Sequence, residues 1–174
     1  MVSSAASAKS SNVEVLRFIA LFGALVIGLT LLVQYPWINQ QLILPYTESI
    51  AWLSYGVLRL FDPGVTVSST IIQSGQLAVD IRKGCDGVVA TLILISACLA
   101  YPLNWHQRFW GTVWGYLLIQ ILNLIRIVGL FLLIQRGSHQ IFDFFHTYVS
   151  QFIVIAAAMV FWIYWVGRQK TVAG

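Results

Sequence analysis

Four long apolar stretches dominate the hydropathy pattern of the chain. They cover residues 15–33, 88–103, 109–134 and 148–166, and polar or irregular sequence separates them. A helix needs about 20 mostly apolar residues to cross a bilayer. Each stretch approaches that length, and 88–103 is the shortest. The pattern therefore predicts an all-α polytopic membrane protein with about four transmembrane helices.

The region between the first two stretches has a different pattern. Residues 42–61 are apolar but include Glu48 and Arg59, which favours a helix lying in the membrane interface, with a fifth span as the alternative. Residues 65–67 and 77–81 alternate between apolar and polar positions around a Gln-Ser-Gly-Gln segment. This period-two pattern predicts a short β-hairpin.

The composition supports a membrane protein. Hydrophobic residues make up 59% of the 174 residues and charged residues 9%, against about 25% charged in soluble domains. Lipid must therefore solvate part of the surface. The net charge of +4 is spread without a basic run, so we expect no nucleic-acid partner, and we expect neither a cofactor nor a metal. We interpret residues 1–174 as one membrane-embedded domain, with 1–12 as a mobile tail.

The distribution of basic residues gives an orientation. With four spans and the N-terminus inside, five basic residues lie on the cytoplasmic side: Lys9, Arg17, Arg108, Arg168 and Lys170. Four lie outside: Arg59, Arg82, Lys83 and Arg136. The positive-inside tendency therefore favours this orientation by a small margin. It places the hairpin and the region before residue 88 on the outer face.

Arg126 is a charged residue within the third apolar stretch. A charge at the centre of a membrane helix costs a few kcal/mol, so such residues face the protein interior and often mark function. Asn123 lies three positions earlier on the same helix face and could orient the guanidinium. The alternative is a structural polar contact between helices.

Cys85 lies in a Gly84-Cys85-Asp86-Gly87 turn just before the second stretch. A thiol at a helix N-terminus, following Arg82 and Lys83, is expected to have a lowered pKa and to be a better nucleophile. The alternative is an inert small hydrophobe, which is how we interpret Cys98. The two cysteines are too far apart along one helix to form a disulfide.

His146 and Asp143 precede the fourth stretch at its outer end. Histidine is a suitable acid/base partner for a thiol near neutral pH, although an isolated histidine could also cap the helix or lie at the interface. In the four-span topology Cys85, His146 and the outer half of the third helix share one side. A thiolate, an imidazole and a guanidinium together form a complete set for acyl transfer.

These same segments resemble the exosortase and archaeosortase family. Residues 83–90 resemble the cysteine motif of the family, 123–127 the arginine motif and 143–146 the histidine motif, and the resemblance runs over about 65–165, most like the exosortase H subgroup. It implies that Cys85, Arg126 and His146 are catalytic, supported by Asn123, Asp143 and Asp86.

The resemblance also implies the substrates and the location. The substrates would be secreted proteins whose C-terminus carries a short motif of the Ile-Pro-Thr-Leu kind followed by Trp, then a transmembrane helix and a basic cluster. The enzyme would lie in the bacterial inner membrane, cleave near the motif on the outer face and pass the acyl group to an unidentified acceptor.

Two other classes of function remain open at this stage. A metal-binding or transport protein could use Cys85, Asp143 and His146 as ligands. A non-catalytic membrane scaffold could use Gly111 and Gly115 as a GxxxG helix contact.

Overall fold

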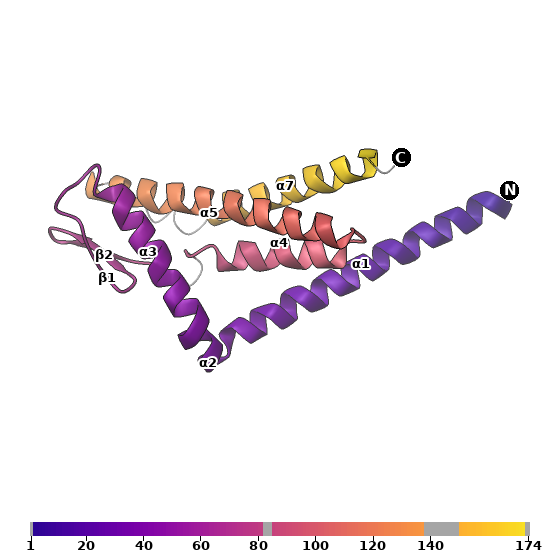
Figure 1. Cartoon of the computed structure of the whole chain (residues 1–174), viewed down its shortest axis with the longest axis horizontal. Helices are drawn as coiled ribbons and strands as arrows, with labels where there is room; N and C mark the ends of the chain where they lie inside the picture. The colour runs from indigo at the N-terminus through magenta and orange to yellow at the C-terminus, as the bar shows by residue number, and fades with distance from the viewer. Residues whose placement is uncertain (1, 82–84, 138–149, 173–174) are drawn as a thin grey trace.

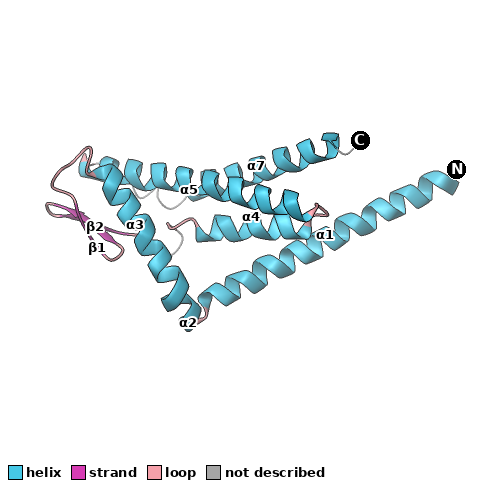
Figure 2. Cartoon of the chain, viewed as in Figure 1, coloured by secondary structure: helices cyan, strands magenta, loops and turns pink. Residues whose placement is uncertain are grey.

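The computed structural model describes residues 2–81, 85–137 and 150–172, and this part of the chain is mainly helical (Figures 1 and 2). Four helices run alternately in opposite directions: α1 (Val2–Gln34), α4 (Val88–Ala100), α5 (Trp105–Gln135) and α7 (Ser150–Val172). Both termini lie at one end of the molecule, and a short helix and a small sheet lie at the other (Figure 1). The predicted polytopic helical architecture is confirmed.

In the described part, three helices are long and apolar enough to span a membrane: Asn12–Gln34, Trp105–Gln135 and Phe152–Gln169. The predicted second span is shorter than expected, because α4 has 13 residues and extends about 20 Å, against a hydrocarbon core of about 30 Å. The helix ends at Ala100 because the following Tyr101 precedes a proline and adopts an extended backbone with ψ 141°.

A helix is present within residues 42–61, as predicted, and it is preceded by a distorted segment. Tyr35 is extended ahead of Pro36, and a short turn, α2 (Pro36–Ile38), leads into a π-helix, η1 (Asn39–Ile43). The helix α3 (Leu44–Leu58) follows, and it crosses the bundle obliquely (Figure 1). It is not among the candidate spans in the described residues. The tail predicted for residues 1–12 is helical from Val2 onwards.

The predicted hairpin is a three-stranded antiparallel sheet in the order β1-β2-β3. Its strands are β1 (Thr66–Ser68), β2 (Ile71–Ser74) and β3 (Leu77–Asp80). The sequence interpretation missed β2 because it assigned Gln73 and Ser74 to the turn. Instead Ser74 pairs with Leu77, so the connection is the two-residue segment after Ser74, where Gly75 has a φ of 58°. A left-handed residue of this kind suits a tight hairpin.

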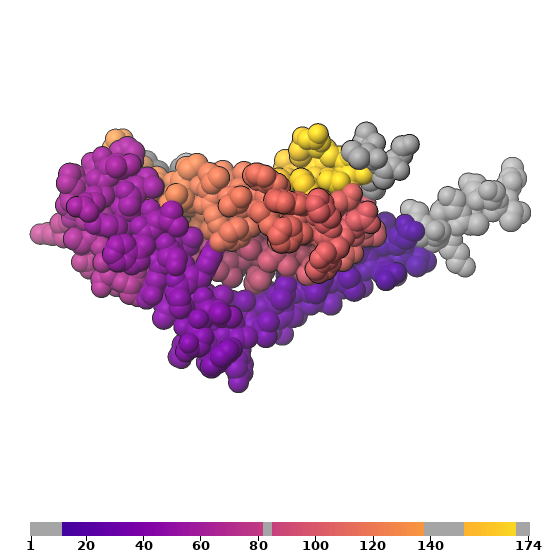
Figure 3. Space-filling view, viewed as in Figure 1, coloured from indigo at the N-terminus to yellow at the C-terminus, as the bar shows by residue number. Residues whose placement is uncertain are grey.

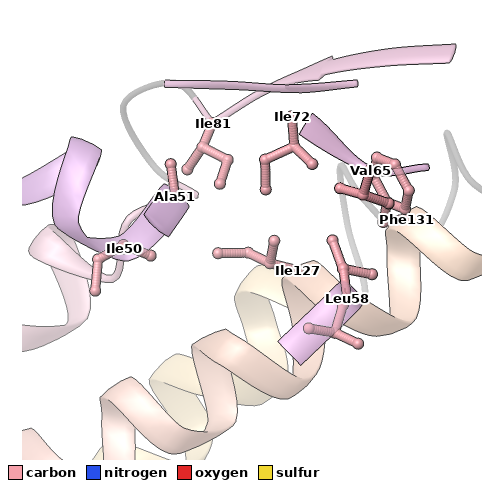
Figure 4. Packing of buried hydrophobic residues seen from close by; sticks show 9 residues of the cluster. Ile50, Ala51, Leu58, Val65, Ile72, Ile81, Ile127 and Phe131 are labelled. Atoms are coloured by element: carbon pink, nitrogen blue, oxygen red, sulfur yellow. The ribbon is translucent and has the colours of Figure 1, made fainter. Parts of the chain in front are cut away.

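The sheet and α3 pack on the C-terminal half of α5 through one apolar cluster (Figure 4). Its buried members are Ile50, Ala51, Leu58, Val65, Ile72, Ile81, Ile127, Val128 and Phe131. In the space-filling view, α3 and the end of α5 form the surface at this end, and α1 runs along one side (Figure 3). The cluster fixes the non-spanning part of the chain to α5.

A second cluster joins the helices of the bundle. It contains Ala90, Leu94, Cys98, Ile119, Val154 and Ala158, from α4, α5 and α7. Gly111 and Gly115 let the helices approach closely, because a Cβ at Gly111 would lie 2.6 Å from the indole nitrogen of Trp165 and one at Gly115 would overlap Leu94. The GxxxG pair is therefore used for packing within this chain.

Candidate functional site

The short length of α4 places Cys85 beside the middle of α5. Residues 101–104 connect the end of α4 to the start of α5, and the two helices run side by side from this connection. However, α5 has 31 residues, or about 46 Å, and α4 extends only about 20 Å. The N-terminus of α4 therefore lies opposite Gln120, Asn123 and Arg126 rather than opposite the end of α5. This brings the cysteine turn to the half-buried Arg126.

Gly87 allows the turn to lie against α5. Its φ is 75°, a left-handed conformation that glycine adopts at little cost. A Cβ at this position would lie 3.1 Å from Nε2 of Gln120 and 3.5 Å from Nδ2 of Asn123. Any larger residue would be strained in its backbone and would also press on the polar face of α5.

Asn123 and Arg126 both contact Cys85. The fully buried Asn123 donates a hydrogen bond from Nδ2 to the backbone carbonyl of Cys85, at 2.9 Å. Arg126 donates from Nη2 to the Cys85 thiol, with an N–S distance of 3.6 Å. These contacts bring together residues that lie 38 and 41 positions apart in the chain.

Asp86 holds the turn in place from the opposite side. Its side chain is 1% exposed; Oδ1 accepts a hydrogen bond from the backbone N–H of Val88 at 3.1 Å, and Oδ2 accepts one from the Thr47 hydroxyl at 3.2 Å. The Tyr46 hydroxyl also donates to the Asp86 carbonyl, at 3.3 Å. The turn is therefore held between α3 and α5.

The electrostatics of the thiol differ from the sequence-based expectation of a lowered pKa. Burial raises the pKa of Cys85 above its ordinary value, and the negative charges of Asp86 and Asp80 raise it further. The positive charge of Arg126 and its hydrogen bond lower the pKa but do not fully compensate. The expectation was wrong because the sequence did not reveal how deeply the turn is buried.

Arg126 lines a small cavity and a larger groove. The small cavity, about 20 Å³, is lined by Cys85 and Arg126 together with the end of β3. The larger groove, about 330 Å³, lies between α5 and α7 and is lined mostly by Leu and Ile side chains. Arg126 and Leu130 line both. An apolar chain in the groove would therefore lie next to the small cavity that Cys85 lines.

Two predicted site residues, Asp143 and His146, lie outside the described residues. Cys98 is buried in the second apolar cluster and both cysteines are free thiols, as predicted. His106 lies in the first turn of α5 and accepts a hydrogen bond from the Trp110 indole at 3.0 Å.

Sequence reasoning missed Tyr46 and Thr47. The available signal was the position of Thr47 on the apolar stripe of α3 with Ile50, Ala51 and Ser54, where a polar side chain needs a buried partner.

In a comparison with protein families, the model described as transmembrane exosortase (Exosortase_EpsH) matches residues 13–163. This match covers most of the chain, including the three segments on which the resemblance rests. It confirms the family predicted from the motifs, whereas the assignment to the H subgroup stays a prediction. Comparisons with curated proteins and with solved structures give no significant match.

Proposed function

Because the chain belongs to the transmembrane exosortase family, we propose that it is a cysteine-dependent sorting transpeptidase that processes the C-terminal signals of secreted proteins. The observation that carries this proposal is the contact between Cys85 and Arg126, which joins a nucleophile and a cation inside an apolar bundle. A charged residue placed at such cost next to a thiol is suited to stabilising charge that develops during reaction.

The proposed reaction begins with proton transfer. Because burial favours the protonated thiol, a base must remove the proton as Cys85 attacks the scissile carbonyl, and we assign this role to His146. The C–S bond forms, and Arg126 stabilises the oxyanion. The C–N bond then breaks, and His146 returns the proton to the leaving amine. The resulting thioacyl intermediate is resolved by a second amine or by water.

The proposed location follows the chain topology. The protein is a multi-pass membrane protein, and the cysteine turn lies at the end of the bundle that carries α3 and the sheet. With both termini in the cytoplasm, this end faces the outside of a bacterial inner membrane. There it would meet secreted proteins that are still anchored by a C-terminal transmembrane helix and basic cluster.

The other two classes of function predict different behaviour. In the described residues, no three metal-ligand side chains gather, and a metal site that includes Asp143 and His146 would make activity sensitive to chelators. A scaffold would need a free helix surface, but Gly111 and Gly115 already contact Trp165 and Leu94 within the chain. Neither class accounts for the contact between Arg126 and the thiol.

The test is processing of a co-expressed reporter that ends in an Ile-Pro-Thr-Leu-Trp motif, a transmembrane helix and a basic cluster. Cys85→Ala should abolish cleavage, and Cys85→Ser should be nearly as poor, because a hydroxyl ionises far less than a thiol. His146→Ala should leave a trace of activity, and Cys98→Ala is the matched control that should process normally. Processing by Cys85→Ala, with no thioacyl adduct trapped by hydroxylamine, would replace this proposal with the metal or scaffold alternative.

A further inference from the structure

A pocket of about 440 Å³, lined by both polar and apolar side chains, lies between the start of α3 and the sheet. Its polar lining residues are Asn39, Thr47, Thr70 and Asp80. Two residues at the end of the sheet, Asp80 and Ile81, also line the small cavity that contains Cys85 and Arg126. The pocket therefore adjoins the candidate catalytic cysteine but lies outside the helices long enough to span the membrane.

The side chains of this pocket match a particular kind of ligand. Asp80 brings a negative charge, and its Oδ1 accepts a hydrogen bond from Thr70 at 2.7 Å. Asn39 brings a donor, because its Nδ2 is buried with no hydrogen-bond partner among the described residues. A buried donor without a partner is costly, so a ligand with an acceptor oxygen would relieve that cost.

We propose that this pocket binds the acyl acceptor, and that the acceptor is a primary amine with a neighbouring carbonyl or hydroxyl oxygen, such as the N-terminal residue of a peptide. The inference rests on the proposed function. The ammonium group binds near Asp80, and the neighbouring oxygen accepts a hydrogen bond from Asn39. Thr47 lines the pocket and links it to the cysteine turn, because its hydroxyl donates a hydrogen bond to Asp86.

The apolar groove between α5 and α7 is poorly suited to this ligand. Its lining is mostly hydrocarbon, and its charged member is Arg126, which repels an ammonium group. The two sites therefore divide the substrates by chemistry. An apolar segment fits the groove, and a cationic polar group fits the pocket next to Asp80.

The proposed transfer step balances without any further reagent. The amine gives up its extra proton to solvent as it leaves the carboxylate, and its nitrogen attacks the thioester carbonyl. The C–N bond forms, the C–S bond breaks, and the electron pair returns to the Cys85 sulfur. The second amine proton then passes to that thiolate, which yields an amide and the free thiol.

The experiment compares two nucleophiles on the same thioacyl adduct. Full-length protein in membranes is loaded with the tailed reporter, and triglycine or hydroxylamine is added in parallel, with the products measured by mass spectrometry. Hydroxylamine is small and uncharged near neutral pH, so it does not need a carboxylate. Asp80→Asn should lower the ratio of triglycine capture to hydroxylamine capture about tenfold, the size expected for losing a hydrogen bond to a charged group.

Two further variants make the result specific. Leu44 also lines the pocket, so Leu44→Trp should fill it and lower the same ratio without changing any charge. Glu48→Gln is the matched control, because Glu48 binds Ser69 at 2.7 Å and does not line the pocket, and it should leave the ratio unchanged.

An adduct that forms normally but shows an unchanged ratio in Asp80→Asn and Leu44→Trp would overturn the acceptor pocket alone. An adduct in the wild type that only water resolves would also overturn it. If the wild type forms no adduct with either nucleophile, the proposed function fails together with this inference.

Discussion

The contact between Cys85 and Arg126 balances two opposing effects on one thiol. Burial favours the neutral thiol, and the guanidinium favours the thiolate. Because burial dominates, the resting site holds a protonated thiol beside a cation. In the proposed reaction, the positive charge is then available for the oxyanion that forms only in the transition state, where it has the greatest effect on the rate.

Arg126→Lys should therefore abolish most activity while keeping the charge. Lysine offers a single point charge and loses its proton more readily when buried, whereas arginine presents a fixed planar fork. We expect processing of the tailed reporter to fall on the order of 100-fold, as for a lost oxyanion-hole donor. Arg136→Lys, at the exposed end of the same helix, is the control and should be unaffected. Near-normal processing by Arg126→Lys would mean that the residue supplies only charge or structure.

The raised pKa of Cys85 predicts how alkylation depends on pH. The thiolate is the reactive form, and an ordinary free cysteine has a pKa of about 8.5. Because the pKa of Cys85 lies above its ordinary value, the alkylation rate should still be rising at pH 8.5. Arg126→Gln removes the influence that lowers the pKa, so it should move the curve to still higher pH and slow alkylation at each pH. Site-resolved mass spectrometry measures both curves, and a plateau well below pH 8.5 would contradict this assignment.

At this scale the motifs predicted which residues react but not the environment of those residues. The cost of placing Arg126 in an apolar helix and the position of Cys85 in a glycine turn were visible in the residues. The direction of the thiol's pKa shift was not, because it depends on α3 and the sheet covering the turn. Burial by segments distant in the chain has no local sequence signal.

At the scale of elements, α3 acts as a support for the cysteine turn. Thr47 and Tyr46 reach Asp86 from one side, and Asn123 reaches the Cys85 carbonyl from the other. The helix α3 is itself fixed to α5 through Leu58 and its apolar neighbours. The position of the nucleophile is therefore set by tertiary packing rather than by α4 alone.

Thr47→Val should weaken this support. The substitution keeps the shape but removes a hydrogen bond to a buried carboxylate, which contributes about 2 kcal/mol. We expect processing to fall about tenfold and the pH profile of Cys85 alkylation to change, because Asp86 acts on the thiol. Thr47→Ser should restore both, and Ser49→Ala, on the exposed side of the same helix, should change neither. A purely structural role would lower the amount of protein in the membrane without moving the pH profile.

The sequence predicted most helices but misjudged two features at this scale. The second span was predicted three residues too long, because apolar residues were counted past a proline. A proline forces the preceding residue out of the helix. The missing strand β2 came from treating polar Gln73 and Ser74 as a turn, although polar side chains are common on the solvent side of an antiparallel sheet. In both places hydropathy alone was a poor guide to backbone geometry.

For the whole molecule, the alternation of α1, α4, α5 and α7 was predictable, and it determines which parts can meet. A crossing order of this kind brings the start of α4 and the C-terminal half of α5 to the same end of the bundle (Figure 1). The depth of the site was not predictable. It depends on α4 having 13 residues against 31 in α5, and that difference became visible only once both helix ends were known.

The orientation of the whole molecule gives the last prediction. The cysteine turn and the sheet lie at the end of the bundle opposite both termini (Figure 1), so they should lie outside when both termini lie inside. An impermeant thiol reagent should therefore label Cys85 in intact cells and stop processing, and it should leave Cys98 unlabelled in the apolar core. Two control cysteines in a Cys85→Ala background report the topology independently of the reactivity of the site. Gln76→Cys, in the β2–β3 turn, should be labelled in intact cells. Trp105→Cys, at a position 77% exposed at the opposite end, should be labelled only after the membrane is opened. The reverse labelling pattern would place the site in the cytoplasm, out of reach of secreted substrates.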